Sequence, residues 1–275
     1  MHHLKDRIIG TLLGLAAGDR IGGPTRMAFQ LATCLNRRDG FEVADAGLLY
    51  LQWWRAGGFD TGPITDRVLF LVDRGISFEQ AARQADAEAG GLTAGCNPAH
   101  RCAPLAMCSL LPDAGLGQLA MAEARLTHQH PLAGDAASAV TCLCRALIRG
   151  EPWPVALAVA AVARHPETCQ ALTPQPFSEL SRSGFATDAL AAAVHFVNDA
   201  ADFSEALERS IAFAGPSNYC PVLVGSIAGA RWGRSQITPV ACCHHGPLIP
   251  ELTSVAQALV SKWSSDATAS KHGLP

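Results

Sequence analysis

Two glycine-stepped stretches near opposite ends of the chain decide the fold. Residues 8–26 are IIGTLLGLAAGDRIGGPTR, and residues 215–233 are GPSNYCPVLVGSIAGARWG. In each stretch three glycines recur at every fourth position, which places them on one face of a helix. Because a glycine inside a helix costs about 1 kcal/mol relative to alanine, this pattern predicts a close approach of two helix backbones. If the helices run antiparallel, the loop after Asp19 meets the loop before Pro221.

Five short motifs, in order along the chain, carry a family resemblance. The first stretch resembles the opening of the ADP-ribosylglycohydrolases, roughly G-x-x-x-G-x-A-x-G-D-A-x-G-x-P-x-E, and the second resembles their closing motif, which ends G-A-x-x-G. Between them, residues 101–105, 126–131 and 184–190 resemble M-R-x-A-P-L, L-T-H-x-x-P and G-Y-V-x-D-T-L. The resemblance implies an all-α fold, an orthogonal multi-helix bundle.

The metal ligands that the resemblance implies are mostly replaced. The family holds two magnesium ions with the glutamate that ends the first motif, a T-D-D-T segment and a D-x-D-T segment. Here these positions are Arg26, residues 59–62 with Asp60 as their one acid, and residues 216–219 (PSNY). Magnesium requires oxygen ligands, usually including carboxylates. We therefore expect a divergent member with no metal ligands and no cofactor, in which Arg26 pairs with Asp60 or with an anionic ligand.

Composition favours one large domain over residues 1–265, followed by a disordered tail at 266–275. The chain has 275 residues, 49% of them hydrophobic and 16% charged, and no linker-like tract. Its net charge of -3 provides no basic surface for nucleic acid or an anionic membrane. The expected partner is therefore a small molecule, similar to a nucleotide or a sugar.

The cysteines favour a reduced, cytoplasmic protein. There are ten, and none forms a C-x-x-C pair, which argues against a disulfide framework. Residues 242–245 (CCHH) suggest zinc, but adjacent ligands cannot all turn to one ion and no second cluster completes a tetrahedral site. We expect these four residues to form a surface loop before the last helix.

Most of the remaining chain shows helical patterning. Residues 77–80 and 202–205 are capping boxes. Apolar residues have helical spacing in four segments: 132–148, 155–164, 186–198 and 253–263.

Asp60 and Thr61 lie on a glycine-flanked turn just before a predicted helix. Exposed amides at a helix N-terminus favour anions, so this turn could bind a phosphate or a carboxylate. The alternative is a plain N-cap, in which one of the two side chains closes the first turn.

Residues 93–101 bring Cys96, Asn97, His100 and Arg101 close together in sequence. A cysteine beside a histidine and an arginine can have a lowered pKa and act as a nucleophile. The alternative is a small buried thiol, with Arg101 as a structural ion-pair partner. Asn97 is expected to supply hydrogen bonds to a ligand.

The loop at residues 214–221 is stiffened by two prolines and a glycine. Asn218 and Tyr219 can donate to a sugar hydroxyl or stack against a ring. The alternative is a packed turn that fills the space of the missing ions. His128, in the third motif, is interpreted as structural.

Two function classes follow from these residues. The first is a hydrolase with a remodelled, metal-independent site that acts on the glycosidic bond of an ADP-ribosyl, nucleotide or related group. The second is a non-catalytic relative that binds an ADP-ribose-like ligand or a protein partner. The catalytic candidates are Asp60, Cys96 and His100. The substrate-binding candidates are Asp19, Arg26, Thr61, Asn97, Arg101, Asn218 and Tyr219.

Overall fold

The structure is a computed structural model that describes residues 2–37 and 41–263, so the predicted tail at 266–275 lies outside the described residues. Within those residues all regular secondary structure is helical, apart from one isolated bridge between Gly95 and Phe185. The all-α prediction is therefore confirmed. The α-helices are α1 (His2–Gly18), α2 (Gly23–Arg37), α3 (Val43–Arg55), α4 (Pro63–Asp73), α5 (Phe78–Glu88), α6 (Asn97–Arg101), α7 (Ala103–Met107), α8 (Asp113–Ala124), α9 (Pro131–Ile148), α10 (Trp153–Ala161), α11 (Pro166–Ala171), α12 (Ala186–Asn198), α13 (Phe203–Ala214), α14 (Tyr219–Trp232) and α15 (Ile249–Ser261). Short 3₁₀ segments are η1 (Phe177–Glu179), η2 (Arg234–Gln236) and η3 (Pro239–Leu248).

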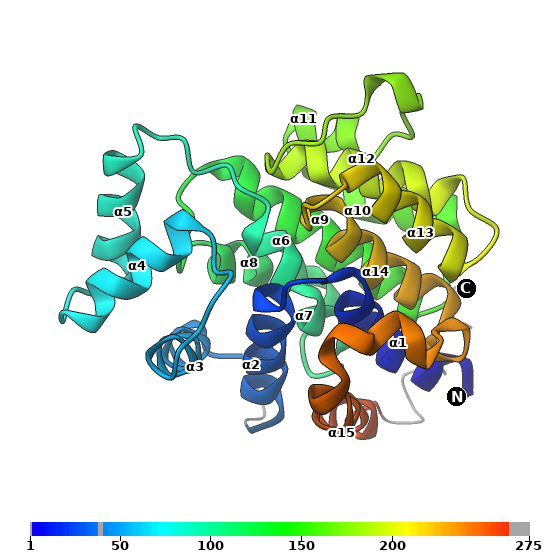
Figure 1. The fold of residues 1–275 in the computed structure, drawn as a ribbon, viewed down its shortest axis with the longest axis horizontal. Coiled ribbons are helices and arrows are strands. Elements are labelled where there is room, and N and C mark those ends of the chain that lie inside the picture. Colours follow the sequence, from blue (N-terminus) through cyan, green and yellow to red (C-terminus); the bar gives the residue numbers. More distant parts are fainter. Residues whose placement is uncertain (1, 38–40, 264–275) are drawn as a thin grey trace, which may run out of the picture.

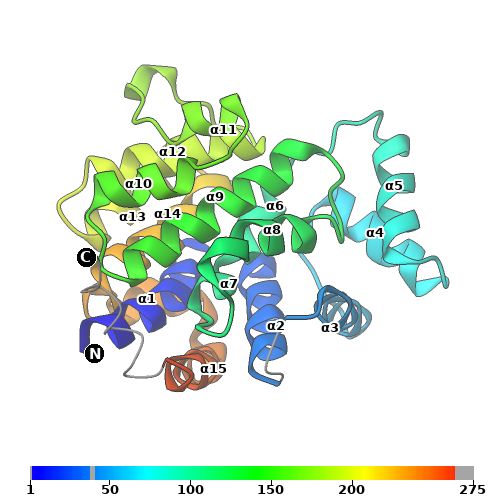
Figure 2. The ribbon, with the colours of Figure 1, turned by 180° about the vertical axis from the view of Figure 1, so that it is seen from behind.

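The two glycine-stepped helices, α1 and α14, pack against each other at the centre of the molecule (Figure 1, Figure 2). A Cβ atom added to Gly10 would lie 2.5 Å from the carbonyl oxygen of Gly229. Further along, Gly14 faces Gly225, and Gly18 faces Pro221. This order shows that the helices run antiparallel and touch along their backbones, as the glycine spacing predicts.

The core surrounds this pair and continues into α9. That helix is long and apolar enough to cross a membrane by composition, but 89% of it is buried inside the protein, which is also typical of the central helix of a bundle. Helices α3, α4 and α5 lie to one side of the body, opposite α10 to α13 (Figure 1). A second, smaller apolar cluster joins α4 to α5.

The predicted helix starts are confirmed in part. The hydroxyl of Ser77 accepts from the amide of Gln80, and Asp202 accepts from the amide of Glu205, which is one of the two bonds of a capping box. Helix α15 begins four residues earlier than predicted and ends two residues earlier. Helix α12 has the predicted bounds. Helix α10 ends three residues earlier than predicted, because Ala163 adopts a positive φ of 56° that a helix cannot contain.

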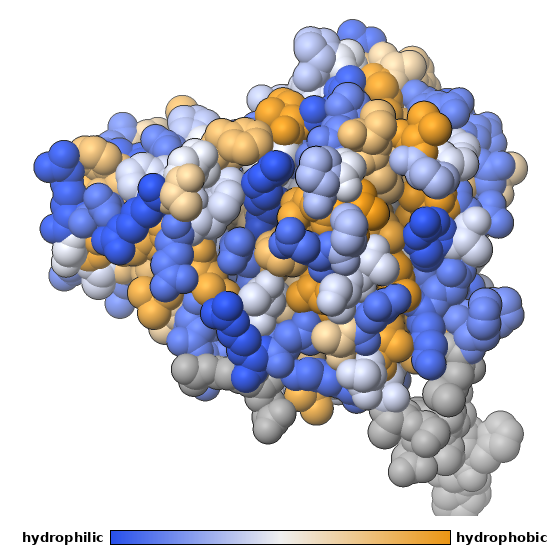
Figure 3. Space-filling view, turned by 60° about the horizontal axis from the view of Figure 1, so that its bottom comes forward, coloured by the Kyte–Doolittle hydropathy of each residue, from blue (hydrophilic) through white to orange (hydrophobic). Residues whose placement is uncertain are grey.

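All ten cysteines are free thiols in the structure. The surface-loop prediction for residues 242–245 is wrong for part of that segment, since Cys242 and His245 are buried within η3. On the face shown in Figure 3, hydrophobic and hydrophilic residues are interspersed.

Candidate functional site

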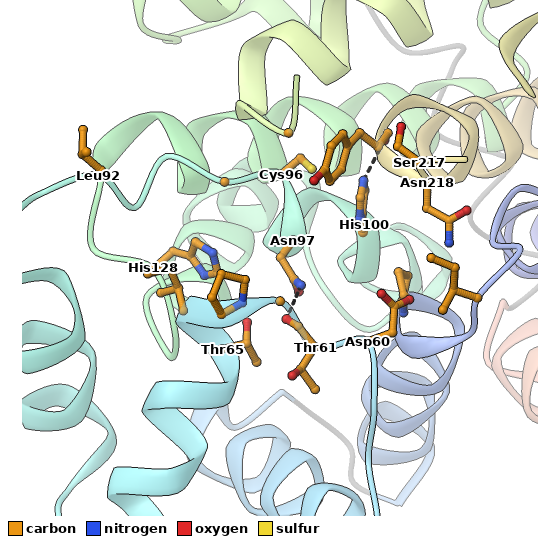
Figure 4. Close-up of a pocket in the computed structure, with 18 residues that line it drawn as sticks. Asp60, Thr61, Thr65, Leu92, Cys96, Asn97, His100, His128, Ser217 and Asn218 are labelled. Atoms are coloured by element: carbon orange, nitrogen blue, oxygen red, sulfur yellow. Dashed lines mark hydrogen bonds between the residues drawn. The ribbon is translucent and has the colours of Figure 1, made fainter. Parts of the chain in front are cut away.

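A cavity of about 370 Å³ opens where the loops before α2, α4, α6 and α14 meet (Figure 4). Its 18 lining residues are 60–65, 95–97, 217–219, Ile21, Pro24, Leu92, His100, His128 and Gly184. Three apolar side chains at the cavity are exposed: Ile21 (49%), Leu92 (84%) and Tyr219 (42%). The loop after Asp19 and the loop before Pro221 therefore meet as the antiparallel glycine helices predict, and the cavity opens beside them.

Asp19 holds the loop before α2 and does not line the cavity. Its side chain is fully buried, and one oxygen, Oδ1, accepts from the amides of Ile21 and Gly22 at 3.1 and 2.8 Å. The other oxygen, Oδ2, accepts from the amide of Thr25 at 2.9 Å. The backbone oxygen of Asp19 accepts from Nε2 of His245. Because backbone amides engage both of its carboxylate oxygens, Asp19 stabilises the loop and does not face a ligand in the cavity.

Asn218 links the loop before α14 to Asp19. Its Nδ2 donates to Oδ1 of Asp19 at 2.8 Å, and its Oδ1 accepts from the amide of Arg20 at 3.3 Å. The guanidinium of Arg20 also donates to the carbonyl oxygens of Gly215 and Ser217. The two loops are thus joined by direct hydrogen bonds, and both polar atoms of Asn218 are already engaged.

Asp60 is the one carboxylate among the lining residues. It has a positive φ of 55°, and its Oδ2 accepts from the amide of Gly23 at 3.2 Å. Asp60 therefore caps the N-terminus of α2, whereas Gly62 stands at the N-cap of α4. Partial burial raises the pKa of the Asp60 carboxyl, the amide of Gly23 lowers it, and the nearby charge of Asp19 raises it further.

The structure contradicts the expected pair between Arg26 and Asp60. The guanidinium of Arg26 lies 4.9 Å from the ring centroid of Phe59 and donates to the carbonyl oxygen of Gly22 at 3.2 Å. No ion pair joins Arg26 to Asp60 in the described residues, and Arg26 is not among the residues that line the cavity. An aromatic face and a carbonyl dipole already surround this cation.

Arg101 lies behind the cavity wall in a buried ion pair. Its Nε donates to Oε1 of Glu123 at 2.6 Å, and neither side chain is exposed to solvent. Its Nη1 donates to Oδ1 of Asn97 at 3.2 Å, and Nδ2 of Asn97 donates to the carbonyl oxygen of Thr61 at 2.5 Å. The structure thus favours the structural alternative for Arg101, and Asn97 connects the loop before α4 to α6.

Cys96 and His100 are both buried, and the backbone amide of His100 donates to the carbonyl oxygen of Cys96 at 3.1 Å, but no hydrogen bond joins their side chains in the described part of the chain. Burial raises the pKa of the Cys96 thiol to about 12, so the thiol stays protonated at neutral pH. This argues against Cys96 as a nucleophile. Nε2 of His100 donates to the carbonyl oxygen of Tyr219 at 2.7 Å, and burial lowers the pKa of the imidazole to about 4.

Thr61, Tyr219 and His128 complete the wall. Thr61 is 5% exposed, and the ring of Tyr219 lies against Gly184 at the mouth of the cavity. Nδ1 of His128 lies 2.9 Å from the hydroxyl of Thr127, and burial lowers the pKa of this imidazole to about 3. Sequence reasoning missed His128 as a lining residue, although the L-T-H-x-x-P motif already marked its position.

The chain is thus a helical bundle built on an antiparallel glycine pair, with a cavity at one end of that pair. The chain belongs to the ADP-ribosylglycohydrolase family, whose sequence model matches residues 1–268. It is 24% identical over 270 residues to the ADP-ribosyl-[dinitrogen reductase] glycohydrolase of Rhodospirillum rubrum, covering 85% of this chain and 88% of that one. Its fold is similar to a solved ADP-ribosylglycohydrolase-related protein complex, with a TM-score of 0.78, 26% identity, and coverage of 95% of this chain and 99% of that chain.

The donor groups around the cavity do not fit the pair of magnesium ions that the family resemblance implies. A dinuclear magnesium site needs several carboxylate oxygens to offset four positive charges. The lining residues contain one carboxylate, and both oxygens of Asp19 are engaged by amides. Across residues 2–37 and 41–263, no group of three or more His, Cys, Asp or Glu side chains is placed to hold a metal ion.

Proposed function

We propose that this protein is a hydrolase of the ADP-ribosylglycohydrolase type with a remodelled, metal-independent site. Its substrate would be the glycosidic bond of an ADP-ribosyl, nucleotide or related group, in the cytoplasm. The observation that supports this most is the position of Asp60 in a cavity of about 370 Å³. Asp60 is the one carboxylate that lines this cavity, is half-buried and has no cationic partner in the described residues. The family membership supports the substrate class, and the ten free thiols support the compartment.

The chemistry of Asp60 suits glycosidic cleavage. The transition state of this reaction carries positive charge on the anomeric carbon, which a nearby carboxylate stabilises. A carboxylate with a raised pKa is also a stronger base, so Asp60 can orient and deprotonate the attacking water. Oδ2 of Asp60 is fixed by the amide of Gly23, and the carboxylate lines the cavity.

Other residues hold this carboxylate in place and shape the cavity. Asn97 fixes the backbone of Thr61, the residue after Asp60. Asn218 fixes the loop that carries Tyr219, whose exposed ring can stack on a base or a sugar at the mouth. Because the polar atoms of both asparagines are engaged by the protein, the proposal gives them positioning roles.

Product analysis tests the proposal. Purified protein treated with a strong chelator would be incubated with ADP-ribosylated peptides and with ADP-ribose derivatives of small alcohols and amines. We expect release of ADP-ribose without added metal, and a loss of at least about 100-fold in Asp60→Asn, the scale of a general base. Asp73→Asn, which alters an exposed carboxylate paired with Arg55 at the far end of α4, is the matched control and keeps full activity.

Two results contradict the proposal. Activity that disappears on chelation and returns with magnesium would refute metal independence. Binding of ADP-ribose without any product, in wild type and Asp73→Asn alike, would favour the non-catalytic relative instead.

A further inference from the structure

His100 presents a hydrogen-bond acceptor to the cavity. Its Nε2 lies 2.7 Å from the carbonyl oxygen of Tyr219. A carbonyl oxygen can only accept, so the proton of the neutral imidazole resides on Nε2, and Nδ1 keeps its lone pair. In the described residues no group donates to Nδ1, and His100 lines the cavity.

Burial keeps this tautomer in place. It lowers the pKa of His100 to about 4, so the ring is neutral at physiological pH. The bond to Tyr219 fixes the ring orientation, because α14 begins at that residue and is packed along α1. His100 therefore cannot exchange its acceptor for a donor without breaking a bond that connects α6 to α14.

His128 lies at the other side of the cavity. Its Nδ1 lies 2.9 Å from the hydroxyl of Thr127, which accepts from Nη2 of Arg101 at 2.9 Å and also lies 3.5 Å from the carbonyl oxygen of Ala124. In Figure 4 the two histidines lie on opposite sides of Asn97, with Asp60 on the side of His100. Two acceptors, Nδ1 of His100 and the carboxylate of Asp60, thus lie on the same side of Asn97.

We infer that His100 is a specificity-determining residue, whose Nδ1 acts with the carboxylate of Asp60 to bind the adjacent hydroxyl groups of a furanose. Two acceptors at one end require a ligand with two donors, and a vicinal diol supplies them. A site built to bond a hydroxyl rejects the analogue that lacks it, because its buried polar atom is left unpaired. This inference rests on the proposed function and names the part of the substrate that His100 selects.

Ribose 5-phosphate and 2-deoxyribose 5-phosphate are suitable probes, because they differ by one hydroxyl. Their dissociation constants would be measured by calorimetry for wild type and variants. We expect wild type to prefer ribose 5-phosphate by roughly 10-fold or more, the scale of one such hydrogen bond. His100→Met removes the acceptor, so the preference should fall below about 3-fold. His100→Gln can donate to Tyr219 and accept from the sugar, so it should restore the preference.

His195→Met is the matched control. His195 is also a buried histidine whose ring bonds to a backbone carbonyl, that of Gln175 at 2.8 Å, but it does not line the cavity. This variant should keep the wild-type preference. If His100→Met binds neither sugar, His100→Gln becomes the deciding variant. The inference is overturned if His100→Gln does not prefer ribose 5-phosphate over 2-deoxyribose 5-phosphate.

The inference and the proposed function can fail separately. Equal binding of both sugars by wild type, or an undiminished preference in His100→Met, overturns the role of His100 even if ADP-ribosyl substrates are hydrolysed. If wild type neither binds these sugars or ADP-ribose nor hydrolyses any ADP-ribosyl substrate, the proposed function itself is refuted.

Discussion

Gly10→Ala tests the contact on which the fold depends. A Cβ atom at this position would lie 2.5, 2.6 and 2.7 Å from three backbone atoms: the oxygen of Gly229, the nitrogen of Arg234 and the carbonyl carbon of Gly233. Ordinary contacts between heavy atoms are about 3.5–4.0 Å, so the two chain segments must separate by about 1 Å. No rotamer change can relieve the overlap, because all three atoms belong to the backbone.

The expected loss of stability follows from two opposing effects. Alanine favours the helix by about 1 kcal/mol relative to glycine. Overpacking a tight core costs about 1–3 kcal/mol or more, and a gap of 0.5–1 Å along a helix pair forfeits roughly a quarter to a half of each dispersion contact. We expect a net destabilisation of about 2 kcal/mol, or a fall in Tm of roughly 4–8 °C, measured by thermal and urea unfolding.

Gly115→Ala supplies the matched control. Gly115 lies in the first turn of α8, and a Cβ atom there would meet no heavy atom within 4 Å. The same substitution should therefore stabilise the protein by about 0.4–1 kcal/mol. If Gly10→Ala is as stable as Gly115→Ala, the close backbone contact between α1 and α14 does not exist in solution.

Three further predictions concern charge. His100 and His128 have folded pKa values of about 4 and about 3, below the unfolded value of about 6.5, so their stability contribution is complete above pH 6.5 and is lost as pH falls. Protonation of each histidine should lower the free energy of unfolding by about 2 kcal/mol between pH 7.5 and pH 5. In His128→Gln the urea midpoint should therefore shift less over this pH range than in wild type. An equal shift in the two proteins contradicts the assignment. Arg101→Met leaves Glu123 buried without its cation and should destabilise by about 3–5 kcal/mol in urea unfolding, whereas adding Glu123→Gln should recover part of this loss; no recovery would mean that packing dominates. Asn218→Asp places a second carboxylate where Nδ2 now lies 2.8 Å from Oδ1 of Asp19. The variant should therefore have a lower Tm than wild type, and millimolar magnesium or calcium should raise it again. A Tm that does not depend on these ions would refute this prediction.

The fold could be predicted because its determinants are local or repeated in the sequence. The glycine spacing in residues 8–26 and 215–233 is visible without a structure, and it has one physical explanation. Capping boxes likewise show their chemistry within four residues, and the N-cap bond of each predicted one forms. The end of α10 was missed because the positive φ of Ala163 depends on tertiary packing, which sequence patterns do not express.

The site was harder to predict, because its contacts join residues far apart in the chain. Asp60 was one of the two expected partners of Arg26, the other being an anionic ligand, but the guanidinium lies over the ring of Phe59 and donates to the carbonyl oxygen of Gly22. Likewise, the environment of Cys96 depends on burial rather than on its neighbours in sequence. Burial raises the pKa of its thiol, whereas an adjacent histidine and arginine suggested the opposite direction.

At Asn218, one of the replaced positions, direct hydrogen bonds take the place that a cation would have beside Asp19. An aspartate at position 218 would face the carboxylate of Asp19 and would need a cation between them, whereas the amide of Asn218 donates directly to it. Arg20 then bonds the carbonyl oxygens of the same loop. Asn218 and Arg20 thus donate to the carboxylate of Asp19 and to the loop before α14, so direct hydrogen bonds hold these two loops together. These direct bonds between the loops support the proposed remodelling of the site.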